Sequence, residues 1–389
     1  MRDDLPLRRA HVALALTFVA FGVVDGTWTA RLPALKQRLA LDSGELGLIV
    51  FAVSGAATLV LPLAGWLPAR FGSRYPAALG LLLAAGSLAA AAFVPGLGTL
   101  AATAVVLGAG FGIVDVAANA DGVALERRLG RHVLSALHGT WSVGLLAGSG
   151  IAAGAAAASL GVRTHFPAVA AGVVVITVVA VPRLLPTTEA AAEAHFALPR
   201  REVALPALLM FCSMFVESAT INWSAVFLAG PARASAAVAA GGVVAFSVAM
   251  AVSRFVGDQL LARWGVAGLA RRGGLVTCVG VALALAARAP AAGLVGFALV
   301  GVGSAALVPA IFRVAGTSAR TSAAAGIAAV ATAGYTGAVV NGPAIGFLAR
   351  GVGLTGALGL VGAAGLVIAL LGPRLGLEAA PAKPAPPGR

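Results

Sequence analysis

The stretch GWLPARFGSR at residues 65–74 lies in a short hydrophilic gap between two long apolar runs. A related stretch, GDQLLARWG, occupies residues 257–265 in the same kind of gap. A shift of 193 residues places Arg70 on Arg263 without any insertion. Further identical pairs at this offset are Ser54 and Ser247, Leu67 and Leu260, Gly72 and Gly265, Gly108 and Gly301, Gly110 and Gly303, and Arg127 and Arg320. Such repetition predicts two copies of one structural unit.

The composition indicates a protein whose solvent is lipid. Of the 389 residues, 60% are apolar and only 11% are charged, and the mean hydropathy is +0.98. A water-soluble domain with so few polar side chains could not cover its surface with them. A membrane-spanning helix needs about 20 mainly apolar residues, so twelve such helices need roughly 240 residues, which this chain length accommodates.

Twelve apolar runs, separated by Pro, Gly or charged residues, are expected to be these helices. They fall at about 10–30, 44–67, 75–94, 98–120, 133–158, 165–185, 204–228, 236–257, 273–289, 291–312, 322–348 and 352–372. We therefore expect an all-α membrane protein of two pseudo-symmetric six-helix bundles, residues 1–185 and 204–372, joined by a cytoplasmic linker at 186–203. Residues 373–389, rich in Pro and Ala, are expected to form a disordered cytoplasmic tail.

Lys and Arg are distributed unevenly between alternate loops. If the amino end lies in the cytoplasm, the inner segments hold 19 of the 27 basic residues and the outer loops hold 7, with Arg254 inside a helix. The positive-inside rule thus predicts that both termini are cytoplasmic and that the protein lies in a bacterial inner membrane. The formal charge of +13 is scattered over short loops, so the continuous basic surface that nucleic-acid binding needs is not expected.

The two repeated stretches resemble the G-x-L-x-D-R-x-G-x-R signature of the major facilitator superfamily, with Ala69 in place of the usual aspartate. The stretch GFGIVDVAAN at 110–119 is similar to the acidic-x-A-A-N pattern of its fucose-permease-like branch, whose acidic residue lies in the sugar and proton pathway. The resemblance implies two facing bundles, a central cavity and alternating access. Arg254 and Asp258, four residues apart, are expected to pair. The gate-stabilising candidates are Arg70, Arg74, Arg254, Asp258 and Arg263.

Three carboxylates fall inside predicted helices: Asp25 in the first, Asp115 in the fourth and Glu217 in the seventh. An ionised carboxylate in mid-membrane costs about 2.5–3.5 kcal/mol, so each needs a partner, water or a proton. The repeat offset places Asp25 on Ser218, so Glu217 occupies nearly the symmetry-related position, and the two acids are expected to face each other across the cavity. We predict proton coupling by these acids, with Asp115 first, and by His138, whose imidazole titrates near neutral pH. The alternative is that arginines hold the acids and so brace the bundle.

Amide, hydroxyl and indole groups near these acids are the candidate solute-binding groups. Asn119 lies one helical turn after Asp115 and shares its face, which suits a hydroxyl-rich ligand. The tryptophans are expected to stack on a sugar, although an interfacial aromatic belt explains them almost as well. The candidates are Asn119, Trp28, Asn222, Trp223, Ser142 and Asn341.

The sequence lacks the phosphate-binding G-x-x-x-x-G-K-[ST] motif and a large soluble region, so an ion gradient is expected to drive transport. Cys212 and Cys278 have neither disulfide nor metal-ligand spacing, and we expect no metal, no cofactor and no enzymatic activity. The leading hypothesis is a monomeric transporter that takes up a small polar solute, for example a sugar, together with protons. Proton-driven efflux of drugs or metabolites is the alternative, and a non-transporting membrane sensor or an intramembrane enzyme is the third.

Overall fold

The computed structural model describes residues 4–61, 67, 70–130, 133–185, 203–317 and 323–375, and this part of the chain contains helices and no strands. Nearly all of the predicted linker and tail, and Ala69, therefore lie outside the described residues. The helices are α1 (Asp4–Ala30), α2 (Leu32–Arg38), α3 (Ser43–Leu59), α5 (Arg74–Ala91), α6 (Leu97–Leu129), α7 (Leu134–Ala157), α8 (Val162–Ala180), α9 (Ala204–Ala229), α10 (Ala236–Ala287), α11 (Pro290–Ser304), α12 (Leu307–Thr317), α13 (Ala323–Ala357) and α14 (Gly359–Leu371), with 3₁₀ turns η1 (Val181–Arg183) and η3 (Gly372–Arg374).

Among the described residues, nine helical segments are long and apolar enough to cross a membrane. A further pair, Gly326–Ala357 and Gly359–Arg374, is also apolar enough and is bent by 68° between its members. The remaining apolar helix, α3, has 17 residues. Together these segments lie at the positions of the twelve predicted spans, and the chain is an all-α membrane protein.

Two boundaries in the second half differ from the prediction. The helix α10 covers both the eighth and the ninth predicted spans, because helical backbone continues through the predicted loop and only Gly265, with φ of +64°, turns the chain. A left-handed backbone of this kind is readily adopted by glycine, which has no Cβ. The tenth predicted span is divided, since α11 ends at Ser304 and α12 begins at Leu307.

Two of the unusual backbone conformations recur at the offset of 193 residues. Gly72 and Gly265 both have positive φ, at 75° and 64°. Ala40 and Arg233 are separated by the same offset, and both have φ of 52°, which is uncommon for residues with a Cβ. Equivalent turns of the two halves thus share one geometry, which confirms the pseudo-symmetry predicted from the repeated stretches.

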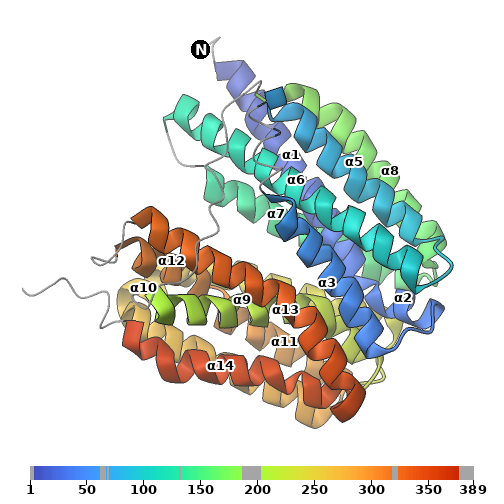
Figure 1. The fold of residues 1–389 in the computed structure, drawn as a ribbon, viewed down its shortest axis with the longest axis vertical. Helices are drawn as coiled ribbons and strands as arrows, with labels where there is room; N and C mark the ends of the chain where they lie inside the picture. Colours follow the sequence, from blue (N-terminus) through green and yellow to red (C-terminus); the bar gives the residue numbers. More distant parts are fainter. Residues whose placement is uncertain are drawn as a thin grey trace, which may run out of the picture.

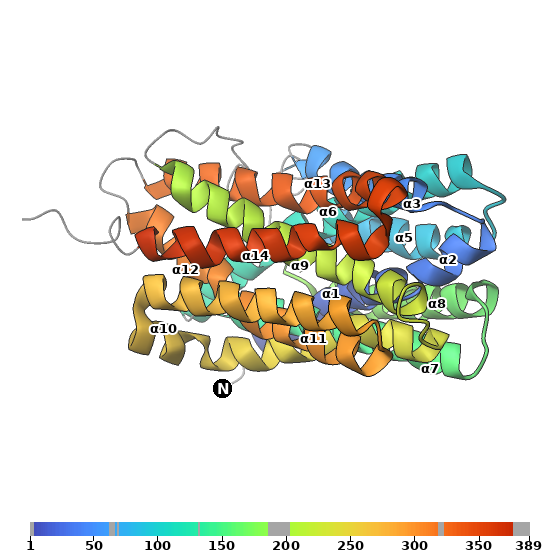
Figure 2. The ribbon, with the colours of Figure 1, turned by 90° about the horizontal axis from the view of Figure 1, so that it is seen from below.

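The helices α1–α8 form one bundle and α9–α14 form the other, and Figure 1 shows the two bundles side by side. They converge where α3 begins and the long α13 nears its end, and they diverge toward the end that carries the start of α1. In Figure 2, α2 lies at one end of the molecule and α12 at the other. We call the convergent end the closed end and the divergent end the open end.

Small residues allow the bundles to touch at the closed end. A Cβ atom added to Gly47 of α3 would lie only 2.4 Å from the carbonyl oxygen of Gly342 in α13. On the other side of the interface, Ala152 of α7 and Ala240 of α10 belong to one buried cluster. Helices in a membrane approach this closely only where their facing side chains are small. The closed end is therefore a tight backbone-to-backbone contact.

Two arginines in the first loop that is predicted to lie outside donate to carbonyl groups of the first bundle, which explains why this loop is basic. Arg31 donates a hydrogen bond of 2.6 Å to the carbonyl oxygen of Leu160. Arg38 donates to the carbonyl oxygens of Ala91 and Val94, at 3.0 and 3.1 Å, where α5 ends. Cations are stabilised at helix C-termini because the last carbonyl groups lack partners within the helix. These basic residues therefore stabilise the first bundle.

Candidate functional site

A cavity of about 290 Å³ lies between the two bundles. Its walls come from α1, α3, α6 and α7 of the first bundle and from α9 and α13 of the second. The volume is at the lower limit of the roughly 300–1,000 Å³ usual for small-molecule sites, so the cavity suits a small solute. The lining residues are Phe21, Asp25, Trp28, Val50, Val53, Ser54, Ala57, Thr58, Leu61, Phe111, Gly112, Asp115, Trp141, Met214, Glu217, Ser218, Ile221, Asn222, Tyr335 and Ala338.

All three predicted intramembrane carboxylates line this cavity. Asp25 of α1 and Asp115 of α6 belong to the first bundle, and Glu217 of α9 belongs to the second. Asp25 and Asp115 are half-buried, and neither pairs with a Lys or Arg in the described part of the chain. A charged carboxylate at such a depth is stable only with water or a ligand beside it, or with a bound proton.

A chain of hydrogen bonds connects Asp115 with His138. The side-chain amide of Asn119 donates to Oδ1 of Asp115 at 3.0 Å. The amide oxygen of Asn119 lies 3.0 Å from Nε2 of His138, which is exposed on α7. Because an amide oxygen only accepts, Nε2 carries a hydrogen in this arrangement. The structure thus brings together the acid, the amide and the imidazole that the sequence analysis singled out.

Glu217 has a different partner environment. Nη2 of Arg254 in α10 lies 3.5 Å from its Oε1, and the two side chains are 13% and 38% exposed for Glu217 and Arg254 respectively. The predicted partner of Arg254 was Asp258, whose side chain lies outside the described residues. The observed pair joins α9 to α10 within one bundle, which is the geometry that the bracing alternative expects, although a partly exposed pair contributes little, and the role of Glu217 stays a prediction.

The candidate solute-binding residues fall into two groups. Trp28 and Asn222 line the cavity, but Trp28 is only 2% exposed and also belongs to the buried core. Trp223 is 0% exposed, belongs to the same core and does not line the cavity, because one residue along a helix turns a side chain by about 100°. Asn341 is also 0% exposed and is absent from the cavity wall. Ser142 is half-buried on α7, where its hydroxyl donates to a carbonyl one turn earlier at 3.4 Å.

Of the arginines in the two repeated loops at 65–74 and 257–265, Arg70 and Arg74 make contacts within the first bundle. Nε of Arg74 donates to the carbonyl oxygen of Leu184 at 2.7 Å, which ties the start of α5 to the end of η1. The guanidinium of Arg70 lies 5.7 Å from the centre of the Phe71 ring. Arg263 is exposed. These contacts hold loop geometry, and the gating role of the three arginines stays a prediction.

An ion pair that joins the two bundles involves residues that the sequence analysis did not single out. The Arg350 guanidinium of α13 lies 2.9 Å from Oδ2 of Asp42 and donates to its Oδ1 at 3.0 and 3.2 Å. Asp42 also caps α3, because the Glu45 backbone amide donates to it at 2.8 Å. A Cβ atom on Gly44 would lie 2.3 Å from Nε of Arg350, so glycine leaves room for the guanidinium. The D-x-x-E spacing at 42–45 predicts the helix cap. The neighbouring sequence does not predict the ion pair, because Arg350 lies 308 residues away from Asp42.

Four polar cavity residues were also missed, among them Ser218 of α9. Tyr335 of α13 reaches the cavity from the second bundle, and Ser54 and Thr58 reach it from α3. The two α3 residues are four apart and so share a helix face, which is the only sequence signal that they carry. Tyr335 adds a phenol that can donate and accept hydrogen bonds.

The geometry agrees with comparison to known proteins. The chain matches the family model of the Major Facilitator Superfamily over residues 13–340. It belongs to the Major Facilitator Superfamily. An uncharacterized MFS-type transporter of Yersinia pestis is 30% identical over 355 residues, which cover 90% of this chain and 92% of the relative. The membrane protein MosC of Rhizobium meliloti is 30% identical over 365 residues, which cover 92% of this chain and 88% of MosC.

Solved structures show the same superfamily fold. The nucleoside transporter NupG, as its D323A mutant, superposes with a TM-score of 0.75 at 13% identity, covering 94% of this chain and 99% of that chain. A second NupG structure gives a TM-score of 0.68 at 15% identity, with 94% and 98% coverage. The chain is therefore a multi-pass membrane transporter of the Major Facilitator Superfamily, and not an enzyme.

Proposed function

We propose that this transporter takes up a small polar solute across the bacterial inner membrane together with protons. The observation that carries the proposal is the cavity shared by both bundles, which has Asp25 and Asp115 on one wall and Glu217 on the other. A site held by two bodies that can move apart is opened and closed by their relative rotation. Carboxylates in such a site can take up a proton on one side of the membrane and release it on the other.

Alternating access follows from the different packing of the two ends. The closed end holds the Asp42–Arg350 ion pair and the Gly47–Gly342 contact. At the open end, His138 and Arg263 are exposed. With both termini in the cytoplasm, as the distribution of basic residues predicts, the open end faces the cytoplasm and the structure is the inward-facing state. We further propose that one monomer forms the complete transport unit, since both walls of the cavity come from one chain.

The chemistry of the cavity suits a solute rich in hydroxyl groups. Asp115 and Asn222 line the cavity and offer a carboxylate and an amide, which can bind hydroxyls as acceptor or donor, and Asn119 holds Asp115 from outside the lining. Trp141 is half-buried in the cavity wall and provides a ring face on which a sugar can stack, whereas only 2% of Trp28 is exposed. NupG is a nucleoside transporter, which is a second class of small hydroxyl-rich solute to test. The resemblance of 110–119 to the fucose-permease-like branch supports a sugar, and this branch assignment stays part of the proposal.

Tryptophan fluorescence of the purified protein tests the proposed solute class. Trp28 and Trp141 line the cavity, so a bound solute changes their emission. We expect a saturable change with one sugar, polyol or nucleoside of the panel, and a loss of that change in the Asn222→Leu variant. The Gly86→Ala variant is the control, because a Cβ atom at Gly86 meets no other atom within 4 Å. A response to hydrophobic cations alone would overturn the polar-solute proposal.

Efflux of amphipathic compounds is the second candidate function. Five aromatic side chains line the same cavity: Phe21, Trp28, Phe111, Trp141 and Tyr335. Aromatic faces attract organic cations, and the nearby carboxylates would add charge complementarity. Expression of the transporter in a drug-sensitive host distinguishes the two functions, because only efflux raises the tolerated concentration of such cations.

The ion pair at the closed end is expected to be insensitive to pH in the physiological range. The pKa of Asp42 is lowered, first because the backbone amide of Glu45 donates to its carboxylate, and further by the guanidinium of Arg350. A lowered pKa means that the pair forms fully above the ordinary aspartate pKa of about 3.9 and is lost only as pH falls through the lowered value. Spin labels at Gln37 and Val352 should therefore report the same distance distribution at pH 5 and pH 8.

The Asp42→Asn variant removes the ion pair at both pH values. Because the wild-type pair is exposed, we expect only a small shift of the same distance distribution toward longer distances. A wild-type distribution that lengthens between pH 8 and pH 5 would show that a different group controls the closed end.

A further inference from the structure

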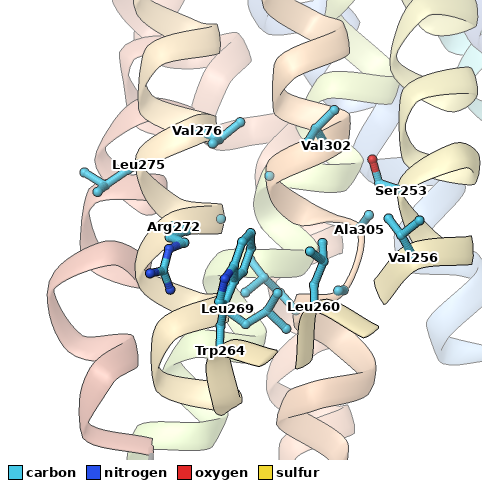
Figure 3. Close-up of a pocket in the computed structure, with 14 residues that line it drawn as sticks. Ser253, Val256, Leu260, Trp264, Leu269, Arg272, Leu275, Val276, Val302 and Ala305 are labelled. Atoms are coloured by element: carbon cyan, nitrogen blue, oxygen red, sulfur yellow. The ribbon is translucent and has the colours of Figure 1, made fainter. Parts of the chain in front are cut away.

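A second cavity, of about 440 Å³, lies inside the second bundle. It is bounded by the two segments of α10 on either side of the Gly265 turn, by α11 and by the start of α12. It shares no lining residue with the cavity between the bundles. Figure 3 shows its residues, with the Trp264 ring standing beside the Arg272 side chain. This cavity plays no part in the transport site described above.

The walls of the second cavity are apolar and reach the outer surface of the bundle. Val256, Leu275 and Val302 line it and are 41%, 47% and 46% exposed. Branched apolar side chains that remain this exposed on a membrane-spanning helix face lipid. The cavity is therefore accessible from the side to acyl chains of the bilayer.

One cation lies at the end of this apolar space. The Arg272 guanidinium stacks 4.5 Å from the centre of the Trp264 ring, and its Nη1 donates to the carbonyl oxygen of Gly268 at 3.4 Å. Among the side chains that the structure describes, no carboxylate pairs with it. A cation in such surroundings attracts an anionic group.

The position of Arg272 along α10 places its charge near the membrane boundary. The two apolar segments of α10 meet at residue 258, and the predicted loop between the eighth and ninth spans, which includes the turn at Gly265, marks that boundary. Arg272 lies seven residues after Gly265, which is about 10 Å along a helix axis. Its side chain extends back toward the turn, as the bond to Gly268 shows, and long basic side chains commonly extend in this way toward lipid headgroups.

We propose that the second cavity binds an anionic glycerophospholipid, with its phosphate on Arg272 and one acyl chain along Leu260, Leu269 and Val276. Arginine binds phosphate through several parallel hydrogen bonds, which favours it as the recognition group. The first bundle provides an internal comparison, because the residue equivalent to Arg272 at the repeat offset is Leu79. Only the second copy of the repeat therefore carries the cation.

Quenching of Trp264 by brominated lipids tests this binding site. The full-length protein is reconstituted in phosphatidylcholine vesicles that contain brominated phosphatidylglycerol or, separately, brominated phosphatidylcholine. The Trp264→Phe variant gives the emission of the other tryptophans, which is subtracted. One basic residue near a membrane surface strengthens binding to an anionic lipid by about fivefold. We therefore expect phosphatidylglycerol to be bound about fivefold more tightly than phosphatidylcholine.

Two substitutions distinguish lipid binding in the second cavity from general attraction of anionic lipid to the basic surface of the protein. The Arg272→Leu variant, which reproduces the first-bundle residue, should reduce the ratio of the two affinities to about one. The Arg271→Leu variant should keep the wild-type ratio, because Arg271 does not line the cavity. The ratio of the two lipid affinities is measured within one variant, so a change that the substitution causes in the emission of Trp264 affects both affinities equally and cancels in the ratio. Equal quenching by both lipids in the wild type, or no quenching by either, would overturn the proposal.

Discussion

The Asp115→Asn variant is expected to lose solute accumulation driven by a pH gradient. Asparagine keeps the size of the side chain and can still bond with Asn119, but it cannot take up a proton. The proton changes the free energy of a mid-membrane carboxylate by about 2.5–3.5 kcal/mol. A free-energy difference of this size corresponds to a ratio on the order of 100 between the protonated and the ionised form. We therefore expect the rate of gradient-driven uptake to fall by about that factor. Uptake by reconstituted vesicles with an inward proton gradient measures it.

Exchange of labelled for unlabelled solute at equal pH is the control for this variant. Exchange requires an intact cavity and alternating access but no net proton movement, so Asp115→Asn should retain it. The Asp25→Asn variant, tested in the same way, shows whether the second carboxylate without a Lys or Arg partner shares the role. If Asp115→Asn accumulates solute as the wild type does, Asp115 is not the coupling residue.

The Gly47→Val variant is expected to separate the bundles at the closed end. A Cβ atom at this position would lie 2.4 Å from the Gly342 carbonyl oxygen and 3.0 Å from Cα of Gly346, so α3 and α13 must move apart. Overpacking of this kind costs about 1–3 kcal/mol, which changes the ratio of closed to separated molecules by roughly 5- to 150-fold. The distance between spin labels at Gln37 and Val352 should lengthen accordingly, after Cys212 and Cys278 have been replaced by serine.

The Gly86→Val variant is the matched control, since Gly86 lies on the exposed face of α5 and a Cβ atom there would meet no other atom within 4 Å. It introduces the same side chain without touching the other bundle. We expect it to keep both the wild-type distance and transport, whereas Gly47→Val should lose uptake. An unchanged distance in Gly47→Val would show that the glycine contact does not hold the closed end.

Much of the fold could be predicted from the sequence because lipid imposes a simple rule on it. Each span needs a long apolar run, so the runs identified the helices. The offset between Gly72 and Gly265 identified the duplication, and both glycines have the positive φ that explains their recurrence. The predicted helix boundaries were less accurate near Gly265, because helical backbone continues from the eighth predicted span into the ninth.

The candidate site was predictable where its groups are close along one helix. Asp115 and Asn119 are one turn apart, and the structure shows their bond. Groups that depend on the packing of distant helices could not be found in this way. Arg254 bonds Glu217, which is 37 residues away, and Asp42 bonds Arg350, which is 308 residues away. The burial of Trp223 likewise depends on the rotation of α9 against its neighbours.

Uptake of a labelled solute by reconstituted vesicles, with and without an inward proton gradient, tests the central claim most directly. The solute is the one that the tryptophan titration identifies. The proposal predicts accumulation above the external concentration with the gradient, equilibration without it, and no accumulation in Asp115→Asn. Equal uptake with and without the gradient, or uptake no greater than in empty vesicles, would contradict the account of a proton-coupled transporter.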